Sequence, residues 1–197
     1  MNNAAQGIGQ ALTSQPGGIG KDTAVSHAAL GMLIFVVCEI MFFGGLVSAY
    51  LVGSAGQDWP PAGQPRLPVW TTAFNTAVLL LSGWFMKRIT NTHKAGTTKN
   101  LGIAMILGLF FVGFQGVEWT RLISHGLTMS SSTYGSYFYL IIGAHATHAL
   151  AALCLLAFVF YRTRQGALNR GLFEASRIFW LFVVGLWPVL YILVYLV

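Results

Sequence analysis

Five long apolar stretches, separated by short polar segments, dominate the chain. They cover about residues 28–52, 69–88, 101–121, 134–161 and 175–197. Each is near or above the roughly 20 predominantly apolar residues that a helix needs to cross a bilayer. Strands of a membrane barrel alternate apolar and polar positions, and these stretches do not. The pattern therefore predicts an all-α membrane protein with five transmembrane helices.

The N-terminal segment has a different composition from the rest of the chain. Residues 1–26 are rich in Gly, Gln and Ser, and they contain no apolar core of a signal peptide. We expect these residues to form a flexible cytoplasmic tail. Residues 27–197 then form the transmembrane bundle, with the first apolar stretch acting as the insertion signal.

The Lys and Arg residues predict how the bundle is oriented. Those that fall on one side, if the stretches alternate in direction, are Lys21, Lys87, Arg88, Lys94, Lys99, Arg162, Arg164, Arg170 and Arg177. Only Arg66 and Arg121 fall on the other side. Because basic residues collect in cytoplasmic loops, we expect a cytoplasmic N-terminus. With five crossings, the C-terminus is expected in the periplasm, and the chain is expected in the bacterial inner membrane.

Composition supports a membrane protein and excludes some functions. Charged residues make up 8% of the chain and hydrophobic residues 55%, so there is too little charge to coat a water-facing surface. The net charge of +6 comes from residues between the apolar stretches and forms no basic stripe, so no nucleic-acid partner is expected. Cys38 and Cys154 lie inside apolar stretches and are interpreted as small hydrophobic residues.

Two polar groups fall near the middle of the predicted membrane. Glu39 lies in the first stretch, and His145 and His148 share one face of the fourth at a spacing of i, i+3. At 1.5 Å per residue all three come to about the same depth, so we expect Glu39 to pair with one of the histidines. Interhelix hydrogen bonding is the favoured interpretation, and proton relay through Glu39 is the alternative. Two histidines on one face cannot bind a haem from opposite sides.

Further polar residues form a second group of candidates. Gln115 and Glu118, also i, i+3, fall nearer the outer end of the third stretch and are interpreted as interhelix polar contacts. The planar guanidinium of Arg suits phosphate. The candidates for binding lipid head groups are Arg66, Arg121, Arg162, Arg164, Glu174 and Arg177. No residue is predicted to be catalytic, to bind a cofactor or to bind a metal.

Taken together, several short motifs resemble subunit III of the haem-copper terminal oxidases. They are C-E-I-M-F-F-G-G-L from Cys38, W-P-P from Trp59, L-P-V-W-T-T-A-F-N-T-A-V-L-L-L-S-G from Leu67, F-Q-G-V-E-W from Phe114, Y-G-S-Y-F-Y-L-I-I-G-A-H-A-T-H-A from Tyr134 and F-E-A from Phe173, followed by the spacing of Trp180, Phe182, Val183 and Trp187. The motifs occur in the family's order from about His27 to the C-terminus. The chain resembles the five-helix form, because its polar N-terminal tail cannot supply the two extra helices of larger members.

The resemblance implies an accessory subunit without haem or copper of its own. Such a subunit packs against subunit I, which with other subunits carries the haem and copper, and associates with subunit II and smaller subunits. It binds structural phospholipids and helps to maintain proton uptake over many turnovers. Three departures are Ile142, Leu181 and Val184, which stand where family members often have Thr, His and Asp.

Several alternatives remain open at the level of sequence. Subunit III of a quinol oxidase or of a nitric-oxide-reductase-associated homologue would look alike, although W-P-P and F-E-A favour cytochrome c oxidase. From other functional classes, a haem-binding membrane cytochrome using His145 or His148 and a small transporter are the alternatives. The absence of an internal repeat weighs against a transporter.

Overall fold

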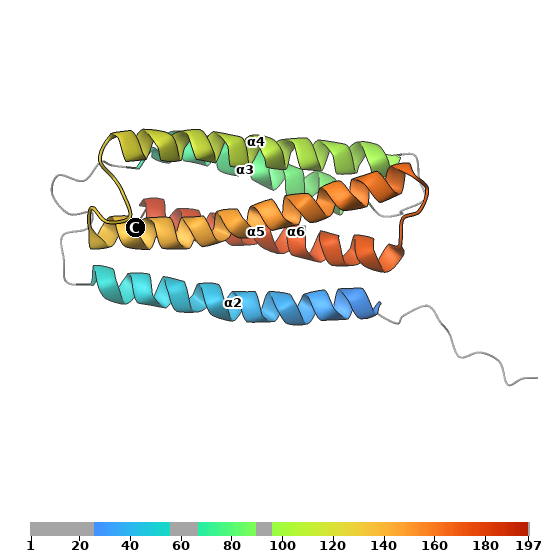
Figure 1. Cartoon of the computed structure of the whole chain (residues 1–197), viewed down its shortest axis with the longest axis horizontal. Coiled ribbons are helices and arrows are strands. Elements are labelled where there is room, and N and C mark those ends of the chain that lie inside the picture. The colour runs from blue at the N-terminus through green and yellow to red at the C-terminus, as the bar shows by residue number, and fades with distance from the viewer. Residues whose placement is uncertain (1–25, 56–66, 90–95, 197) are drawn as a thin grey trace, which may run out of the picture.

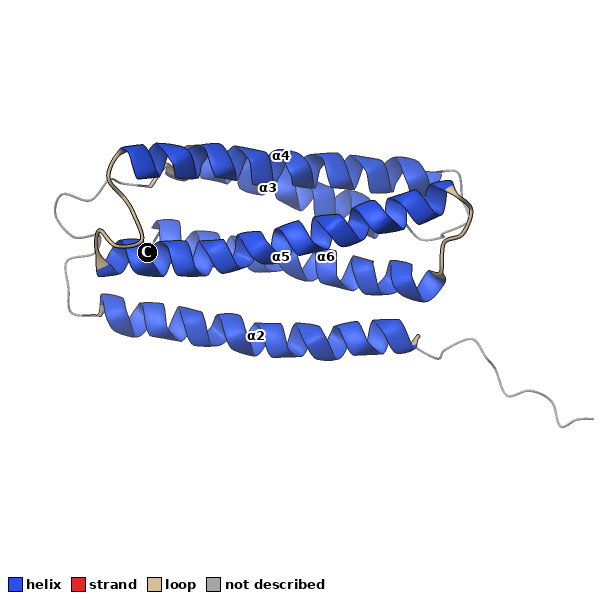
Figure 2. Ribbon diagram, in the orientation of Figure 1, coloured by secondary structure: helices blue, strands red, loops and turns tan. Residues whose placement is uncertain are grey.

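The computed structural model describes residues 26–55, 67–89 and 96–196. These residues form five long helices and one short π-helical segment: α2 (His27–Ser54), α3 (Val69–Lys87), α4 (Gly96–Ser124), α5 (Thr133–Arg164), α6 (Arg170–Tyr191) and η1 (Ile192–Leu196). All five are long and apolar enough to cross a membrane, α6 being counted together with η1. No strand occurs in the described part of the chain (Figure 2). The predicted all-α class with five transmembrane helices is confirmed.

Local sequence signals account for the helix ends. The side chains of Ser26, Ser132 and Asn169 accept hydrogen bonds from the first free backbone N–H groups of α2, α5 and α6. Just after the C-terminal ends of α4 and α5, Gly126 and Gly166 have φ values of 90° and 68°. This left-handed conformation costs glycine little, and it allows the backbone to turn back on the last carbonyl groups of each helix.

The helices lie side by side in three layers (Figure 1). In this view α3 and α4 pair on one side, α5 and α6 lie in the middle, and α2 forms the opposite side. α6 is the central element, because it packs against α2, α3 and α5. α2 is the least enclosed helix, with only Ala29, Phe43 and Tyr50 buried.

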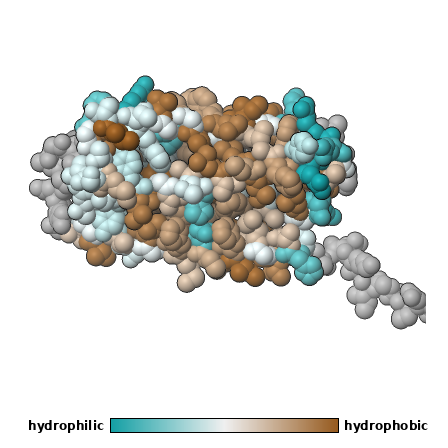
Figure 3. All heavy atoms as spheres, viewed as in Figure 1, coloured by the Kyte–Doolittle hydropathy of each residue, from teal (hydrophilic) through white to brown (hydrophobic). Residues whose placement is uncertain are grey.

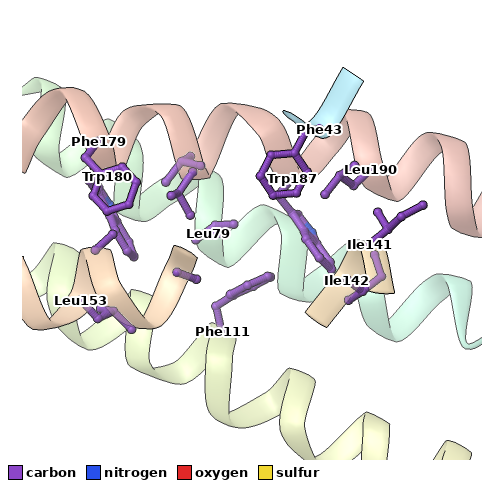
Figure 4. Close-up of a cluster of buried hydrophobic side chains, with 14 of the residues drawn as sticks. Phe43, Leu79, Phe111, Ile141, Ile142, Leu153, Phe179, Trp180, Trp187 and Leu190 are labelled. Atoms are coloured by element: carbon purple, nitrogen blue, oxygen red, sulfur yellow. The ribbon is translucent and has the colours of Figure 1, made fainter. Parts of the chain in front are cut away.

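Two tryptophans of α6 fill the centre of the bundle. Trp180 and Trp187 are fully buried and reach toward Leu79, Phe111 and Leu153 of the neighbouring helices (Figure 4). α4 has a glycine where Trp180 approaches. A Cβ atom added at Gly108 would lie 2.5 Å from the indole ring, so this position has no room for a side chain.

The surface of the middle of the bundle is largely apolar, and hydrophilic residues gather toward its ends (Figure 3). Ile34, Val37, Met41, Ile106 and Phe74 are among many large apolar side chains that are more than half exposed. On a water-soluble protein such an area would be an extensive exposed patch, whereas in a bilayer it faces lipid tails. The protein is therefore a multi-pass membrane protein.

Most helices extend beyond the apolar stretches that predict them. α4 begins five residues before the predicted stretch and ends three residues after it, and α6 begins at Arg170 instead of residue 175. Hydropathy marks the part of a helix that lies in hydrocarbon, whereas capping decides where the helix ends. The last predicted stretch contains two kinds of helix. α6 continues through Pro188 to Tyr191, and the chain is π-helical from Ile192 to Leu196. Residues 1–25, which hold most of the predicted tail, lie outside the described residues.

Candidate functional site

Glu39 of α2 and His148 of α5 meet about halfway along the two helices. His148 Nε2 lies 2.9 Å from Glu39 Oε2, and the two side chains are only 18% and 15% exposed. The two groups are in contact but are not aligned for a straight hydrogen bond. The predicted pairing of Glu39 with one of the two histidines is thus present, and the partner is His148.

The other ring nitrogen of His148 shows how protons are arranged in this pair. His148 Nδ1 lies 2.7 Å from the carbonyl oxygen of Ala144, one turn earlier on α5. A carbonyl oxygen can only accept, so Nδ1 carries a hydrogen and donates it. The contact between Nε2 and Oε2 then requires one further proton, held by either the ring or the carboxyl group. In both forms the pair has no net charge, which suits its place in hydrocarbon.

Aromatic side chains surround the pair. The His148 ring has Phe43 at 5.3 Å in an edge-to-face arrangement and Phe42 and Phe179 at 6.3 and 6.4 Å, measured between ring centroids. Phe43 and Phe42 come from α2 and Phe179 from α6, so the contact ties three helices together. Burial beside rings lowers the local dielectric, which strengthens the interaction within the pair.

His145 does not join this pair. It is 1% exposed and packs against Trp187, with ring centroids 5.0 Å apart, and edge-on to Phe111. Neither of its ring nitrogens has a hydrogen-bond partner among the described residues. The sequence predicts one polar cluster of three residues at this depth, and the structure divides it into a Glu39–His148 pair and a separate His145.

A second polar contact joins α3, α4 and the C-terminal segment. Asn75 Nδ2 donates to the carbonyl oxygen of Phe111 at 3.1 Å and lies 3.5 Å from Gln115 Oε1. Gln115 Nε2 donates to the hydroxyl of Tyr195 at 3.0 Å. Gln115 therefore makes the interhelix contacts that the sequence predicts for it.

The tryptophans of α6 add two hydrogen bonds that sequence reasoning did not find. Trp180 Nε1 donates to Ser82 Oγ at 3.0 Å, and Ser82 in turn donates to the carbonyl oxygen of Ala104 at 2.8 Å. Trp187 Nε1 donates to Thr76 Oγ1 at 2.8 Å. The signal was available, since Ser82 and Thr76 lie inside an apolar stretch, where hydroxyl groups need partners.

Glu118 and three of the candidate lipid-binding residues, Arg121, Glu174 and Arg177, have protein partners. Glu118 is buried and binds Arg121 at 3.1 Å, although the Arg121 side chain itself is 66% exposed. Glu174 binds Arg170 at 3.0 Å. Arg177 donates to the carbonyl oxygens of Ile89 and Lys87 at the end of α3. Glu118 lies near the outer end of α4, and its partner Arg121 belongs to the same helix, so an interhelix contact of Glu118 stays a prediction.

The remaining candidates for binding lipid head groups either are exposed or lie outside the described residues. Arg162 and Arg164 are exposed at the end of α5, where the Arg164 guanidinium lies 5.3 Å from the centre of the Phe160 ring. Arg66 lies outside the described residues. The binding of lipid head groups by these residues stays a prediction.

No group of three or more His, Cys, Asp or Glu side chains comes close enough to hold a metal ion within residues 26–55, 67–89 and 96–196. The arrangement of the polar residues is instead one of pairs that join neighbouring helices. Glu39–His148 joins α2 to α5, Asn75–Gln115 joins α3 to α4, and Trp180–Ser82 joins α6 to α3.

Comparison with known proteins places this bundle in a family. The family model described as cytochrome c oxidase subunit III matches residues 16–197. The protein named probable cytochrome c oxidase subunit 3 of Mycobacterium leprae is 31% identical over the full length of both chains. The cytochrome c oxidase subunit 3 of Synechocystis is 36% identical over 84% of this chain and 74% of its own, and that of Petromyzon marinus is 33% identical over 84% and 67%. The chain therefore belongs to the cytochrome c oxidase subunit III family.

Proposed function

We propose that the chain is an accessory subunit of a proton-pumping cytochrome c oxidase, without a haem or copper of its own. The observation that carries this proposal is the match to the cytochrome c oxidase subunit III family over residues 16–197. His148 has both ring nitrogens engaged, by Ala144 and by Glu39, which supports the absence of a metal on this residue. A histidine that binds a metal must have a free ring nitrogen. His145 lies on the same face of α5 and is enclosed by the rings of Phe111 and Trp187. The two histidines therefore cannot hold a haem from opposite sides.

The charge distribution supports an orientation with the N-terminus in the cytoplasm. Arg88, Lys99, Arg162, Arg164 and Arg170 lie at the end of the bundle where α2 begins. The C-terminus lies at the opposite end (Figure 1). Because basic residues favour the cytoplasmic side, the C-terminus is expected in the periplasm, and the complex in the inner membrane of a bacterium.

The partners follow from this role and from the exposed helix surfaces. An oxidase subunit III works in a complex, and here we propose direct contact with the catalytic subunit I and association with subunit II and smaller subunits. The relatives from Mycobacterium leprae and Synechocystis are named as cytochrome c oxidase subunits, which favours cytochrome c over quinol as the electron donor. The subunit supports proton uptake by the catalytic subunit indirectly, through lipid and packing.

Bound phospholipid is the second part of the proposal. Arg162 and Arg164 present two exposed guanidinium groups at the expected cytoplasmic end, where they can bind lipid phosphate. Arg170 offers a matched control on the same end, because it is already paired with Glu174.

The lipid proposal can be tested by measuring phospholipid that copurifies with the complex. Replacing Arg162 and Arg164 together with Ala should lower the amount of anionic phospholipid retained per complex. Arg170→Ala should change it much less. Equal retention by the double variant and the native protein would contradict this part of the proposal.

The accessory role is tested with a strain that lacks this chain. We expect the remaining oxidase to keep its haem spectrum and its initial rate of oxygen reduction, and to lose activity progressively during turnover. Reintroducing the native chain should restore sustained activity. If the oxidase lost a haem or copper signal together with this chain, the proposal of a cofactor-free subunit would be wrong.

A further inference from the structure

A cavity lies between α4 and α5 and has a volume of about 120 Å³. Its inner wall is formed by buried side chains of three helices, namely Phe111 of α4, Ile142 of α5 and Trp187 of α6. Trp187 reaches toward Phe111 (Figure 4), and the two rings lie edge to face with their centroids 4.9 Å apart. Gly116 and Leu150 also line the cavity and are exposed at the outer surface of the bundle. The cavity therefore opens toward the surrounding lipid.

The wall of this cavity does not suit a polar occupant. The ring nitrogens of His145 and the indole Nε1 of Trp119 are buried too deeply for even a water molecule to touch them. Gln115 already binds Asn75 and Tyr195. A buried water needs two to four polar partners, which the described residues of this wall do not offer. The cavity is therefore dry, and its occupant is apolar.

The size of the cavity favours a compact occupant over a long one. An engineered apolar cavity of about 150 Å³ stays dry and binds benzene or xenon, and the cavity between α4 and α5 is only slightly smaller. An acyl chain that entered it would lose freedom of rotation about its carbon–carbon bonds, as side chains do on burial. A rigid molecule of a few atoms has no such freedom to lose, and it still gains dispersion contacts with the surrounding rings.

We propose that this cavity binds a small, compact apolar molecule from the bilayer, of the class to which dioxygen belongs. Such molecules prefer hydrocarbon to water, so the bilayer supplies them at the opening between Gly116 and Leu150. The site itself does not depend on the proposed role in the oxidase. The choice of dioxygen within this class rests on that role, because an oxidase consumes dioxygen.

Xenon and dioxygen are the two probes, and methyl groups report where they bind. Ile142 lines the cavity, whereas its neighbour Ile141 is also buried but does not line it. Val117 is exposed to lipid next to the opening and reports gas dissolved in the bilayer. The full chain, with ¹³C-labelled methyl groups on Ile and Val and in lipid nanodiscs, is studied by NMR under rising pressure of xenon. The measurement is repeated with dioxygen, and nitrogen is the diamagnetic reference.

We expect the Ile142 methyl signals to shift with xenon pressure and to saturate, whereas those of Ile141 change little and those of Val117 do not saturate. Dioxygen is paramagnetic, so it should raise the relaxation rate of the Ile142 methyl groups well above that of Ile141. Ala146→Leu should abolish both effects at Ile142, because the added atoms fill the cavity that Ala146 lines. Ala151→Leu is the matched control on α5, since Ala151 is exposed and does not line the cavity. This variant should respond like the native chain.

Three results would overturn the proposal. A xenon response at Ile142 that does not saturate, like that of Val117, would show that lipid chains fill the cavity. Native responses of Ile142 in both Ala146→Leu and a second filling variant, Gly116→Leu, would place any binding elsewhere. Saturable xenon binding without enhanced relaxation by dioxygen would exclude dioxygen as a ligand. None of these measurements depends on oxygen reduction, so the site and the proposed function can fail independently.

Discussion

The contact between Glu39 and His148 gives a quantitative prediction about how α2 is attached. We consider Glu39→Leu, His148→Leu and the double variant. Each single change leaves one polar group without its partner in a largely apolar environment, whereas the double change removes both. The double variant should therefore lose less stability than the sum of the single losses.

The expected coupling follows from measured interhelix polar interactions in membranes, which average about 0.6 kcal/mol and reach about 1.7. An average value corresponds to roughly a threefold change in an equilibrium constant. The 2.9 Å contact and the low exposure of both groups favour a value at or above the average, and the imperfect alignment favours one below the maximum. Glu39→Gln should cost less than Glu39→Leu, because an amide can donate to the imidazole nitrogen.

The assay is a double-mutant cycle on the purified chain, with the free energy of unfolding measured in mixed micelles. Met41→Leu combined with Phe158→Leu provides a control cycle, because both side chains are exposed on the same two helices. That control should be additive. Additivity of the Glu39 and His148 changes, or equal losses for Glu39→Gln and Glu39→Leu, would refute the reasoning. If Glu39→Gln instead left stability unchanged but strongly slowed proton-linked turnover of the complex, Glu39 would act in proton relay.

Two further predictions concern the packing around α6. Gly108→Ala should lower the free energy of unfolding by about 1–3 kcal/mol, because the added Cβ would meet Trp180. Gly113→Ala on the same helix is the control: its Cβ meets nothing, so the free energy of unfolding should change by no more than about 0.5 kcal/mol. Similar losses at both positions would contradict the packing described for α4 and α6. Ser82→Ala should cost about 1–3 kcal/mol, because it leaves the buried indole N–H of Trp180 without an acceptor. Trp180→Phe in the Ser82→Ala background should then add less than it does in the native chain, and full additivity would argue against this hydrogen bond.

Hydropathy and charge were sufficient to predict the number and type of the membrane-spanning elements. The physical reason is strong, because a backbone in hydrocarbon must satisfy its hydrogen bonds within the helix. Helix ends were predicted less well, since Ser26, Ser132 and Asn169 cap helices beyond the apolar stretches. Capping depends on single residues that hydropathy does not register.

Depth along the helices put Glu39 level with two histidines, but it did not show that α2 and α5 are neighbours or which histidine would make the contact. His145 and His148 are three residues apart, so they lie on overlapping parts of one helix face. The choice between them depends on the rotation of α5 against α2 and α6, which the whole bundle determines. The same limit explains why the cavity beside His145 was not predicted, because a cavity is defined by side chains of helices distant in sequence.

The most direct test of the central claim is a comparison of oxygen-reduction time courses for the oxidase with and without this chain, together with the haem and copper content of both preparations. We predict equal cofactor content per catalytic subunit, similar initial rates, and a progressive loss of activity only in the preparation without the chain. Loss of a haem or copper centre together with the chain, or identical time courses in both preparations, would contradict the account.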